Sequence, residues 1–305
     1  MNRNLTSIDQ LEVKQIKEIH EKANKYFNNP KFNSKLKGKL LLNFFFENST
    51  RTRLSFEIAA KRMGAEVVNI DVSLSSLKKG ETIEDMAKTI SAMRPHFVTI
   101  RHESSGIVDL LAKHIDACVI NAGDGTNEHP TQALLDSFVI WQKKGRINGL
   151  KVAICGDVLH SRVARSNLKL LHKMGAKLSV VSPPTLVPKV YEEWLDEKFG
   201  AKFYTNLEDG IKNADVVMML RIQQERMMGG SYISSPQEYF KLYGLTHKRL
   251  QKAAKDAIIM HPGPINRGVE ISCELADDEK KSVILQQVEA GVAVRQALLE
   301  IISFS

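Results

Sequence analysis

Strand-like apolar runs alternate with amphipathic segments along the whole chain, and this alternation limits the fold more than any other feature. The first half has predicted strands at residues 40–46, 66–72, 97–101 and 117–121. The second half has them at residues 151–155, 177–181, 202–205, 216–220 and 258–260. Because these strands are largely apolar and helical segments separate them, they predict parallel sheets covered on both faces by helices.

Residues 145–149, with glycine at both ends, mark the best domain boundary, because one alternating series ends there and another begins. We predict an α/β protein of two doubly wound domains, residues 1–146 and 147–287, each a parallel sheet flanked by helices. The last helix, at residues 288–302, is expected to pack back on the first domain, which then includes residues 288–305. Helical periodicity also occurs at residues 6–27, 54–63, 83–93, 104–114, 131–143, 162–174, 187–199 and 207–212. Residues 223–246 are predicted to form a long irregular loop.

The charge balance favours small anionic ligands. The 305 residues include 43 Lys and Arg against 35 Asp and Glu, a net charge of +8. Since the basic residues are spread along the chain and aromatic residues are only 7%, a nucleic-acid surface is disfavoured. The N-terminus lacks a signal-peptide core, and no apolar run approaches the roughly 20 residues of a membrane span. We predict a cytoplasmic protein that binds neither nucleic acid nor membrane.

Neither the cysteine spacing nor any familiar cofactor motif predicts a metal or cofactor site in this sequence. Cys118, Cys155 and Cys273 are widely spaced in apolar or mixed runs, which predicts buried, reduced thiols. The residues after Gly156 do not complete a dinucleotide fingerprint, and no Walker A sequence is present. No cluster of histidines or carboxylates has metal-ligand spacing. The sequence therefore predicts neither a cofactor nor a metal.

One strand-to-helix junction has the composition of a phosphate site. Ser49, Thr50, Arg51, Thr52 and Arg53 follow the first predicted strand and precede an amphipathic helix. A helix start offers free backbone N–H groups and a positive dipole end, and arginine suits phosphate. The alternative is an ordinary helix cap with surface charges. A cap needs one hydroxyl, so three hydroxyls and two arginines favour anion binding.

Polar residues follow other predicted strands too, at the sheet edge where open α/β sheets bind ligands. They include Arg101, His129, Gln132, Arg162 and Arg221. His129 and Gln132 at a helix start could equally cap or pack, and the residues alone leave both readings open. The set is rich in cations and poor in candidate acids and bases. This favours catalysis by positioning and charge stabilisation.

Taken together, these stretches resemble the catalytic chains of the aspartate carbamoyltransferase family. The matching strings are FFENSTRTRLSFE (45–57), KGET (79–82), RH (101–102), NAGDGTNEHPTQ (121–132), GD (156–157) with HSR (160–162), RIQ (221–223) with ER (225–226), and HPGP (261–264) with NRG (266–268). They occur in family order across nearly the whole chain. Ornithine carbamoyltransferases carry Asp-x-x-x-Ser-Met-Gly and His-Cys-Leu-Pro where this chain reads RIQQER and HPGP.

The resemblance implies transfer of a carbamoyl group from carbamoyl phosphate to L-aspartate, which gives N-carbamoyl-L-aspartate and phosphate in pyrimidine biosynthesis. An acceptor other than aspartate, such as ornithine, remains the alternative. In the implied site, Ser49, Thr50, Arg51 and Thr52 hold the phosphate. The carbamoyl group is gripped by Thr52, Arg101, His129 and Gln132.

The resemblance also assigns the acceptor side and the assembly. Arg162, Arg221 and Gln223 bind the aspartate carboxylates, and Lys79 also contacts aspartate. The backbone of Gly263 and Pro264 belongs to the carbamoyl-phosphate site and helps to place the attacking amine. Ser75 and Lys79 reach the site of a neighbouring subunit, so the implied active unit is a homotrimer with shared sites. The sequence leaves open whether a regulatory chain or a dihydroorotase is a further partner.

Overall fold

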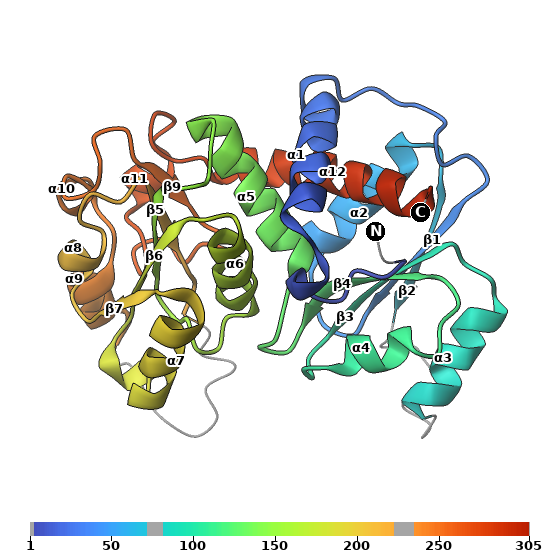
Figure 1. Ribbon diagram of the computed structural model, residues 1–305, viewed down its shortest axis with the longest axis horizontal. Coiled ribbons are helices and arrows are strands. Elements are labelled where there is room, and N and C mark those ends of the chain that lie inside the picture. Colours follow the sequence, from blue (N-terminus) through green and yellow to red (C-terminus); the bar gives the residue numbers. More distant parts are fainter. Residues whose placement is uncertain (1–2, 72–81, 223–234, 305) are drawn as a thin grey trace. The chain divides into compact units, whose positions relative to one another are not determined.

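The computed structural model describes residues 3–71, 82–222 and 235–304. The chain divides into two compact units (Figure 1). Unit 1 comprises Met1–Phe138 and Val288–Ser305, and unit 2 comprises Val139–Gln287. The divisions fall inside two helices, α5 (Pro130–Lys144) and α12 (Ile284–Ser303). Each of these helices therefore contributes residues to both units.

Unit 1 is built on a four-stranded parallel sheet in the order β2-β1-β3-β4. Its strands are β1 (Leu40–Phe45), β2 (Glu66–Asp71), β3 (Phe97–His102) and β4 (Cys118–Asp124). The strand order reverses between β1 and β3. In open α/β sheets such a reversal is the topological switch point, and ligands bind beyond the carboxyl ends of the strands there.

Helices cover both faces of this sheet (Figure 1). α3 (Ile83–Ala92) and α4 (Ile107–Ala112) lie on one face, and α1 (Val13–Asn28) and α2 (Thr50–Arg62) lie on the other. The α3–α4 side is a continuous apolar core that includes Leu42, Phe44, Val98, Ile100, Met86, Ile90, Val108 and Leu111. Alternate strand residues supply it, as the period of two in a β-strand requires. A short 3-10 helix, η1 (Ile8–Gln10), precedes α1.

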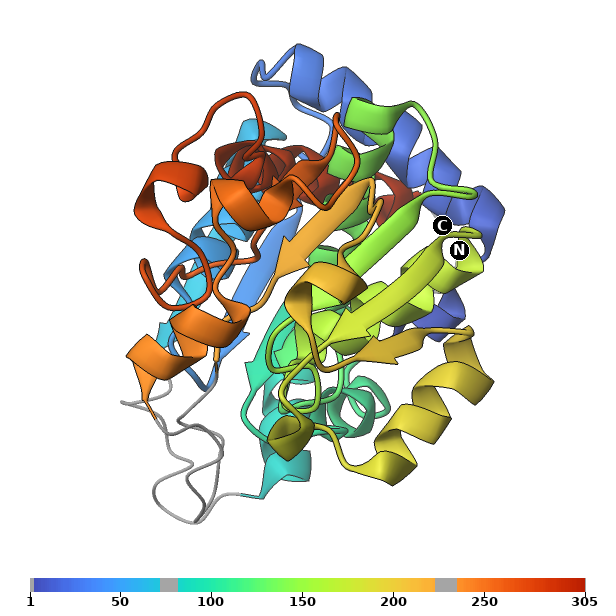
Figure 2. The ribbon, with the colours of Figure 1, turned by 90° about the vertical axis from the view of Figure 1, so that its left-hand side faces the viewer.

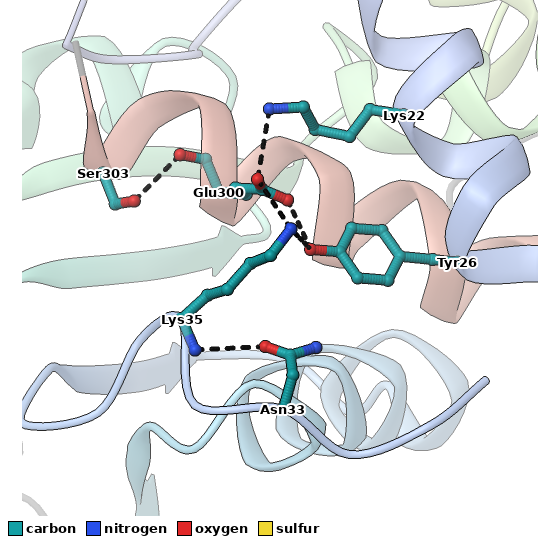
Figure 3. Close-up of polar contacts among 6 residues, drawn as sticks. All are labelled: Lys22, Tyr26, Asn33, Lys35, Glu300 and Ser303. Carbon is teal, nitrogen blue, oxygen red and sulfur yellow. Dashed lines mark hydrogen bonds and ion pairs between the residues drawn. The ribbon is translucent and has the colours of Figure 1, made fainter. Parts of the chain in front are cut away.

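The C-terminal helix is fixed to unit 1 by a buried carboxylate, as Figure 3 shows. Glu300 of α12 accepts a hydrogen bond from the Tyr26 hydroxyl of α1. Lys35 Nζ lies 2.9 Å from Glu300 Oε1, and Lys22 Nζ lies 3.3 Å from the same atom. The carboxylate therefore ties α12 to α1 and to the segment before β1. The expected packing of this helix on the first domain is confirmed.

Unit 2 holds a five-stranded parallel sheet in the order β7-β6-β5-β8-β9, whose strands lie side by side in Figure 2. They are β5 (Lys151–Cys155), β6 (Lys177–Val181), β7 (Lys202–Tyr204), β8 (Val216–Met219) and β9 (Ile258–Met260). The helices are α6 (Arg162–Lys173), α7 (Lys189–Phe199), α8 (Leu207–Gly210), α9 (Pro236–Tyr243), α10 (His247–Leu250) and α11 (Cys273–Ala276), with η4 (Pro184–Leu186) as a 3-10 turn. The switch point lies between β5 and β8.

The predicted architecture is confirmed, with three local corrections. The segment predicted to be irregular contains α9, which Ser235 caps and Pro236 begins. Helix α2 starts at Thr50 rather than at residue 54, so residues 50–53 of the predicted phosphate site lie in its first turn. Cys273 is exposed, whereas Cys118 and Cys155 are buried as expected, and all three are free thiols. Within the parts of the chain that the structure describes, no helix combines the length and apolarity needed to cross a membrane.

Candidate active site

The start of α2 lies directly beyond β1, at the switch point of unit 1. Ser49 is the N-cap residue, yet its side chain makes no capping hydrogen bond. The alternative reading of this stretch, an ordinary cap, is therefore not seen at the Ser49 side chain. Thr50 and Arg51 are exposed in the first turn, while Thr52 is buried. The first-turn N–H groups, three hydroxyls and a guanidinium thus gather at the positive end of a helix dipole.

Arg101 is the second-last residue of β3, on the other side of the switch point, where it pairs in register with Phe45 of β1. Its Nε lies 2.6 Å from Glu47 Oε1, and its Nη1 donates to the Ala122 carbonyl at 3.4 Å. The guanidinium is therefore held between the segment after β1 and the end of β4. Glu47 therefore neutralises a cation that, by the family resemblance, is expected to bind the carbamoyl group.

The loop from β4 to α5 is built around one buried carboxylate. Asp124 accepts hydrogen bonds from the backbone N–H groups of Gly106 (2.7 Å) and Glu128 (3.1 Å). It also accepts from the side-chain amides of Asn121 (2.8 Å) and Asn127 (3.0 Å). These bonds organise the chain immediately before His129. The sequence places His129 after this loop but does not indicate that Asp124 shapes it.

Gly125 is required in this loop by geometry. Its φ is +45°, and a Cβ atom at this position would come within 2.6 Å of the Ser105 backbone nitrogen. A side chain would strain both the backbone and the packing. The tight turn brings the chain to the start of α5, where Pro130 occupies the first helical position.

His129 and Gln132 lie together at the start of α5, as predicted from the sequence. His129 is 3% exposed and Gln132 is 9% exposed. Gln132 Nε2 donates to Asp136 Oδ1 at 2.9 Å, one helical turn later. The backbone N–H of Gln132 donates to the His129 carbonyl at 3.0 Å. Gln132 therefore lies in the first turn of α5, and His129 lies directly before that turn.

Sequence reasoning misses Arg295, a buried arginine of α12 behind this first turn. Arg295 Nη2 donates to Thr131 Oγ1 at 3.3 Å, and Nη1 donates to the Gly291 carbonyl at 3.0 Å. Its guanidinium carbon lies 4.8 Å from the centre of the Phe56 ring of α2. Burial lowers the pKa of Arg295 to about 9, an effect that the Asp136 charge opposes and the Arg101 charge reinforces. The only signal in the sequence is a cation within an apolar helix.

In unit 2, Arg162 and Arg221 follow the two strands that flank the switch point, β5 and β8. Arg162 is the first residue of α6 and is 3% exposed. Ser161 caps this helix by accepting from the Ala164 N–H at 3.2 Å. Gly156 has a φ of +128°, and a Cβ there would meet the Leu220 carbonyl at 2.7 Å, so glycine lets the two strand ends approach.

Gly263 and Pro264 follow β9, and a buried histidine holds them. His261 Nδ1 accepts from the Gly263 N–H at 2.8 Å, so the proton of the neutral ring is on Nε2, which lies 3.0 Å from Glu270 Oε1. The same carboxylate oxygen accepts from the Asn266 N–H at 2.6 Å. The loop is thus closed on itself by one His–Glu pair. Ser75, Lys79 and Gln223 lie outside the described residues.

The two units match two known domains in the same order. A family model described as the carbamoyl-phosphate-binding domain of aspartate/ornithine carbamoyltransferases matches residues 3–142. A second, described as the Asp/Orn-binding domain, matches residues 148–302. A relative from Rhizorhabdus wittichii, named aspartate carbamoyltransferase catalytic subunit, is 53% identical over 99% of this chain and 95% of its own length. The chain belongs to the aspartate carbamoyltransferase family.

Other relatives and solved structures agree with this membership. A Ruegeria pomeroyi protein with the same name is 51% identical over 99% of this chain and 96% of its own length. The crystal structure of Trypanosoma cruzi aspartate transcarbamoylase in complex with carbamoyl aspartate and phosphate has a TM-score of 0.83 and 28% identity, covering 97% of this chain and 94% of that one. An ornithine carbamoyltransferase from Thermus thermophilus, with a TM-score of 0.87 over 99% of both chains, is only 22% identical and shares the fold.

Proposed function

We infer that this chain is an enzyme that transfers the carbamoyl group of carbamoyl phosphate to the amine of L-aspartate, giving N-carbamoyl-L-aspartate and phosphate. This inference rests on the arginine residues that follow the strands at the switch point of each unit. Unit 1 offers the start of α2 with Arg101, and unit 2 offers Arg162 and Arg221. A Trypanosoma cruzi relative has been crystallised with carbamoyl phosphate and aspartate. The reaction is an early step of pyrimidine biosynthesis.

The donor is held by unit 1. Ser49, Thr50, Arg51 and Thr52 bind the phosphate through hydroxyls, a guanidinium and first-turn N–H groups. Because this cradle already stabilises an anion, phosphate can leave without help from a metal. Helix α2 packs against β1 and β2, so the donors of its first turn are fixed before substrate arrives.

The carbonyl of the donor develops negative charge as the aspartate amine attacks it. Thr52, Arg101 and His129 are the donors that stabilise this oxygen. One preorganised donor of this kind is typically worth about 3–4 kcal/mol of barrier. No covalent enzyme intermediate is needed, since the amine attacks directly and phosphate departs. Gln132 grips the rest of the carbamoyl group.

The acceptor is held by unit 2 together with residues outside the described ranges. Arg162, Arg221 and Gln223 bind the two carboxylates of aspartate, and the backbone at Gly263 and Pro264 helps to place the reacting groups. Bidentate arginine–carboxylate pairing also selects against ornithine, whose side chain is cationic. This selectivity favours aspartate over the alternative acceptor.

We propose further that the active form is a cytoplasmic homotrimer with shared sites. In this arrangement Ser75 and Lys79 of one subunit complete the site of its neighbour, and Lys79 contacts aspartate. Chains carrying Lys79→Ala and chains carrying Arg51→Ala should each be inactive alone. Mixed trimers should recover activity, because one site in such a trimer can take both intact residues. No recovery in verified mixed trimers would contradict the sharing of sites.

The function itself is tested by ureido-product formation from carbamoyl phosphate with a panel of amino-acid acceptors. Aspartate should be carbamoylated and ornithine should not. Arg51→Ala should strongly reduce kcat/KM for carbamoyl phosphate. Arg221→Ala should raise the aspartate KM and leave carbamoyl phosphate binding largely intact. Turnover with ornithine in place of aspartate would overturn the acceptor assignment, and absence of turnover with every acceptor would overturn the activity.

A further inference from the structure

Asp136 lies beneath Gln132 in a position that decides how the Gln132 amide is oriented. It is fully buried on α5, and its Oδ1 lies 2.9 Å from Gln132 Nε2. An ionised carboxylate only accepts hydrogen bonds, so the amide NH2 group, and not the amide carbonyl, must face Asp136. The Gln132 carbonyl oxygen is consequently turned away from Asp136.

This orientation matters for which end of the carbamoyl group Gln132 can recognise. A carbamoyl group presents an acceptor, its C=O, and a donor, its NH2. Because one N–H of its amide is bonded to Asp136, Gln132 has its carbonyl oxygen on the side away from Asp136 and can present it to the ligand as an acceptor. It is therefore matched to the carbamoyl NH2 and not to the carbonyl, which the other donors of the site address.

A nearby cation stabilises a buried carboxylate, and Arg295 of α12 is a buried cation in the same unit. The Asp136 charge acts favourably on the buried Arg295 guanidinium. Arg295 is also fixed by Thr131 Oγ1 and by the Gly291 carbonyl. A side chain at position 291 would come within 2.7 Å of Arg295 Nη1, so the glycine leaves room for the guanidinium. Arg295 thus lies against the same helical turn that carries Gln132.

We propose that Asp136, supported by Arg295, is a positioning residue that holds the Gln132 carbonyl toward the carbamoyl NH2 and so selects carbamoyl phosphate over acyl phosphates that lack this NH2. The proposal rests on the assignment of Gln132 to the carbamoyl group made above. Asp136 itself does not touch the substrate. Its effect on catalysis is transmitted through the orientation of one amide.

A double-mutant cycle with two ligands tests this proposal. Carbamoyl phosphate kinetics and the inhibition constant of acetyl phosphate, which carries a methyl group in place of the NH2, are measured for the wild type, Gln132→Ala, Asp136→Asn and the double variant. Asp136→Asn should lower kcat/KM for carbamoyl phosphate about tenfold, because the Asn side chain can face Gln132 with its NH2 and so turn the Gln132 carbonyl oxygen away from the carbamoyl NH2. Acetyl phosphate inhibition should change less than about threefold.

In the Gln132→Ala background, Asp136→Asn should have almost no further effect, because the amide through which it acts is gone. Additive losses in the double variant would overturn the proposal. Equal losses for carbamoyl and acetyl phosphate would also overturn it, since they would indicate a general loosening of the site. If the wild type carbamoylates no acceptor at all, the proposed function fails instead, and this outcome is distinguished by the wild-type assay alone.

Three further variants separate positioning from folding. Asp124→Asn makes the same carboxylate-to-amide change at a buried residue of unit 1 whose hydrogen bonds go to the loop before His129. It should lower carbamoyl and acetyl phosphate binding alike. If Asp136→Asn does not fold, Arg295→Lys keeps the compensating charge with a different geometry and should retain a preference for carbamoyl phosphate. Arg295→Met should lose that preference, and an unchanged preference in Arg295→Met would contradict the supporting role.

Discussion

His20 makes the fold of unit 1 sensitive to acid. It is buried on α1, and its Nε2 lies 2.9 Å from Ser137 Oγ of α5. Ser137 donates its hydrogen to the Leu134 carbonyl at 3.0 Å, so its oxygen can only accept from the imidazole. This contact fits the neutral ring with a proton on Nε2. Burial lowers the pKa of His20 from 6.5 to about 4.

The sign and size of the effect follow from proton binding. Between pH 6.5 and about 4 the unfolded chain holds a proton on this imidazole that the folded chain does not. The stability that the neutral histidine contributes is therefore complete above pH 6.5 and is lost as the pH falls toward 4. At about 1.4 kcal/mol per pKa unit, the free energy of unfolding drops by about 2 kcal/mol at pH 5 and by about 3 kcal/mol near pH 4.

Urea unfolding of the wild type and of His20→Phe at pH 7 and pH 5 measures this effect. Phenylalanine removes the titrating group and suits a site beside the Phe138 ring, whose centre lies 6.0 Å from that of His20. Circular dichroism reports the unfolding, and hydrogen exchange of α1 peptides localises it to unit 1. The wild type should lose about 2 kcal/mol more than the variant between the two pH values.

The matched control is His114→Gln, at a half-buried histidine of the same unit. It should show the wild-type dependence on pH, because His20 is still present. If His20→Phe and the wild type lose the same free energy between pH 7 and pH 5, the assignment of this acid sensitivity to His20 is refuted.

Three further changes are expected to have distinct effects. Glu47→Gln removes the carboxylate 2.6 Å from Arg101 Nε, so carbamoyl phosphate should bind several-fold tighter by calorimetry, and weaker binding would count against competition between Glu47 and the ligand. Glu270→Gln weakens the contact with His261 Nε2, and His261 holds the Gly263–Pro264 backbone. The KM for carbamoyl phosphate should therefore rise while inhibition by phosphate stays nearly constant, and a change in both would argue against a local effect. Glu300→Gln should lower the unfolding free energy by about 1–3 kcal/mol at pH 7. Burial raises the pKa of Glu300, but hydrogen bonds from Tyr26 and Lys35 outweigh burial and hold the pKa below 4.5. The stability lost in Glu300→Gln should therefore become smaller as the pH falls through this lowered pKa, because the wild-type carboxylate is then protonated as well.

The sequence predicts the sheets well because the strands are short, apolar and separated by helices with clear periodicity. It predicts Ser49–Arg53 and His129–Gln132 as sites because strand ends of parallel sheets converge at one edge. Whether Ser49 caps α2 depends on side-chain rotamers, which composition does not encode. α9 is missed although Ser235 and Pro236 are good start signals, because the surrounding glycines and serines favour a loop.

The supporting residues of the site are the ones that sequence reasoning misses. Asp136, Arg295 and Glu270 make no recognisable motif, and each acts on a site residue through burial and hydrogen bonds. Arg295 is 163 positions from Gln132 along the chain, so no local pattern relates the two. The ion pair between Glu47 and Arg101 likewise depends on the register of β1 with β3.

The division of unit 1 between the two ends of the sequence has a consequence for synthesis on the ribosome. Residues up to Phe138 emerge first, but Arg295 and Glu300 follow only after the whole of unit 2 has been made. Unit 2 can therefore complete its core while unit 1 still lacks the helix that covers α1 and α2. The Tyr26 hydroxyl and Thr131 can form their hydrogen bonds with Glu300 and Arg295 only after α12 has been synthesised. In nascent chains stalled before residue 288, unit 2 should therefore resist proteolysis better than unit 1.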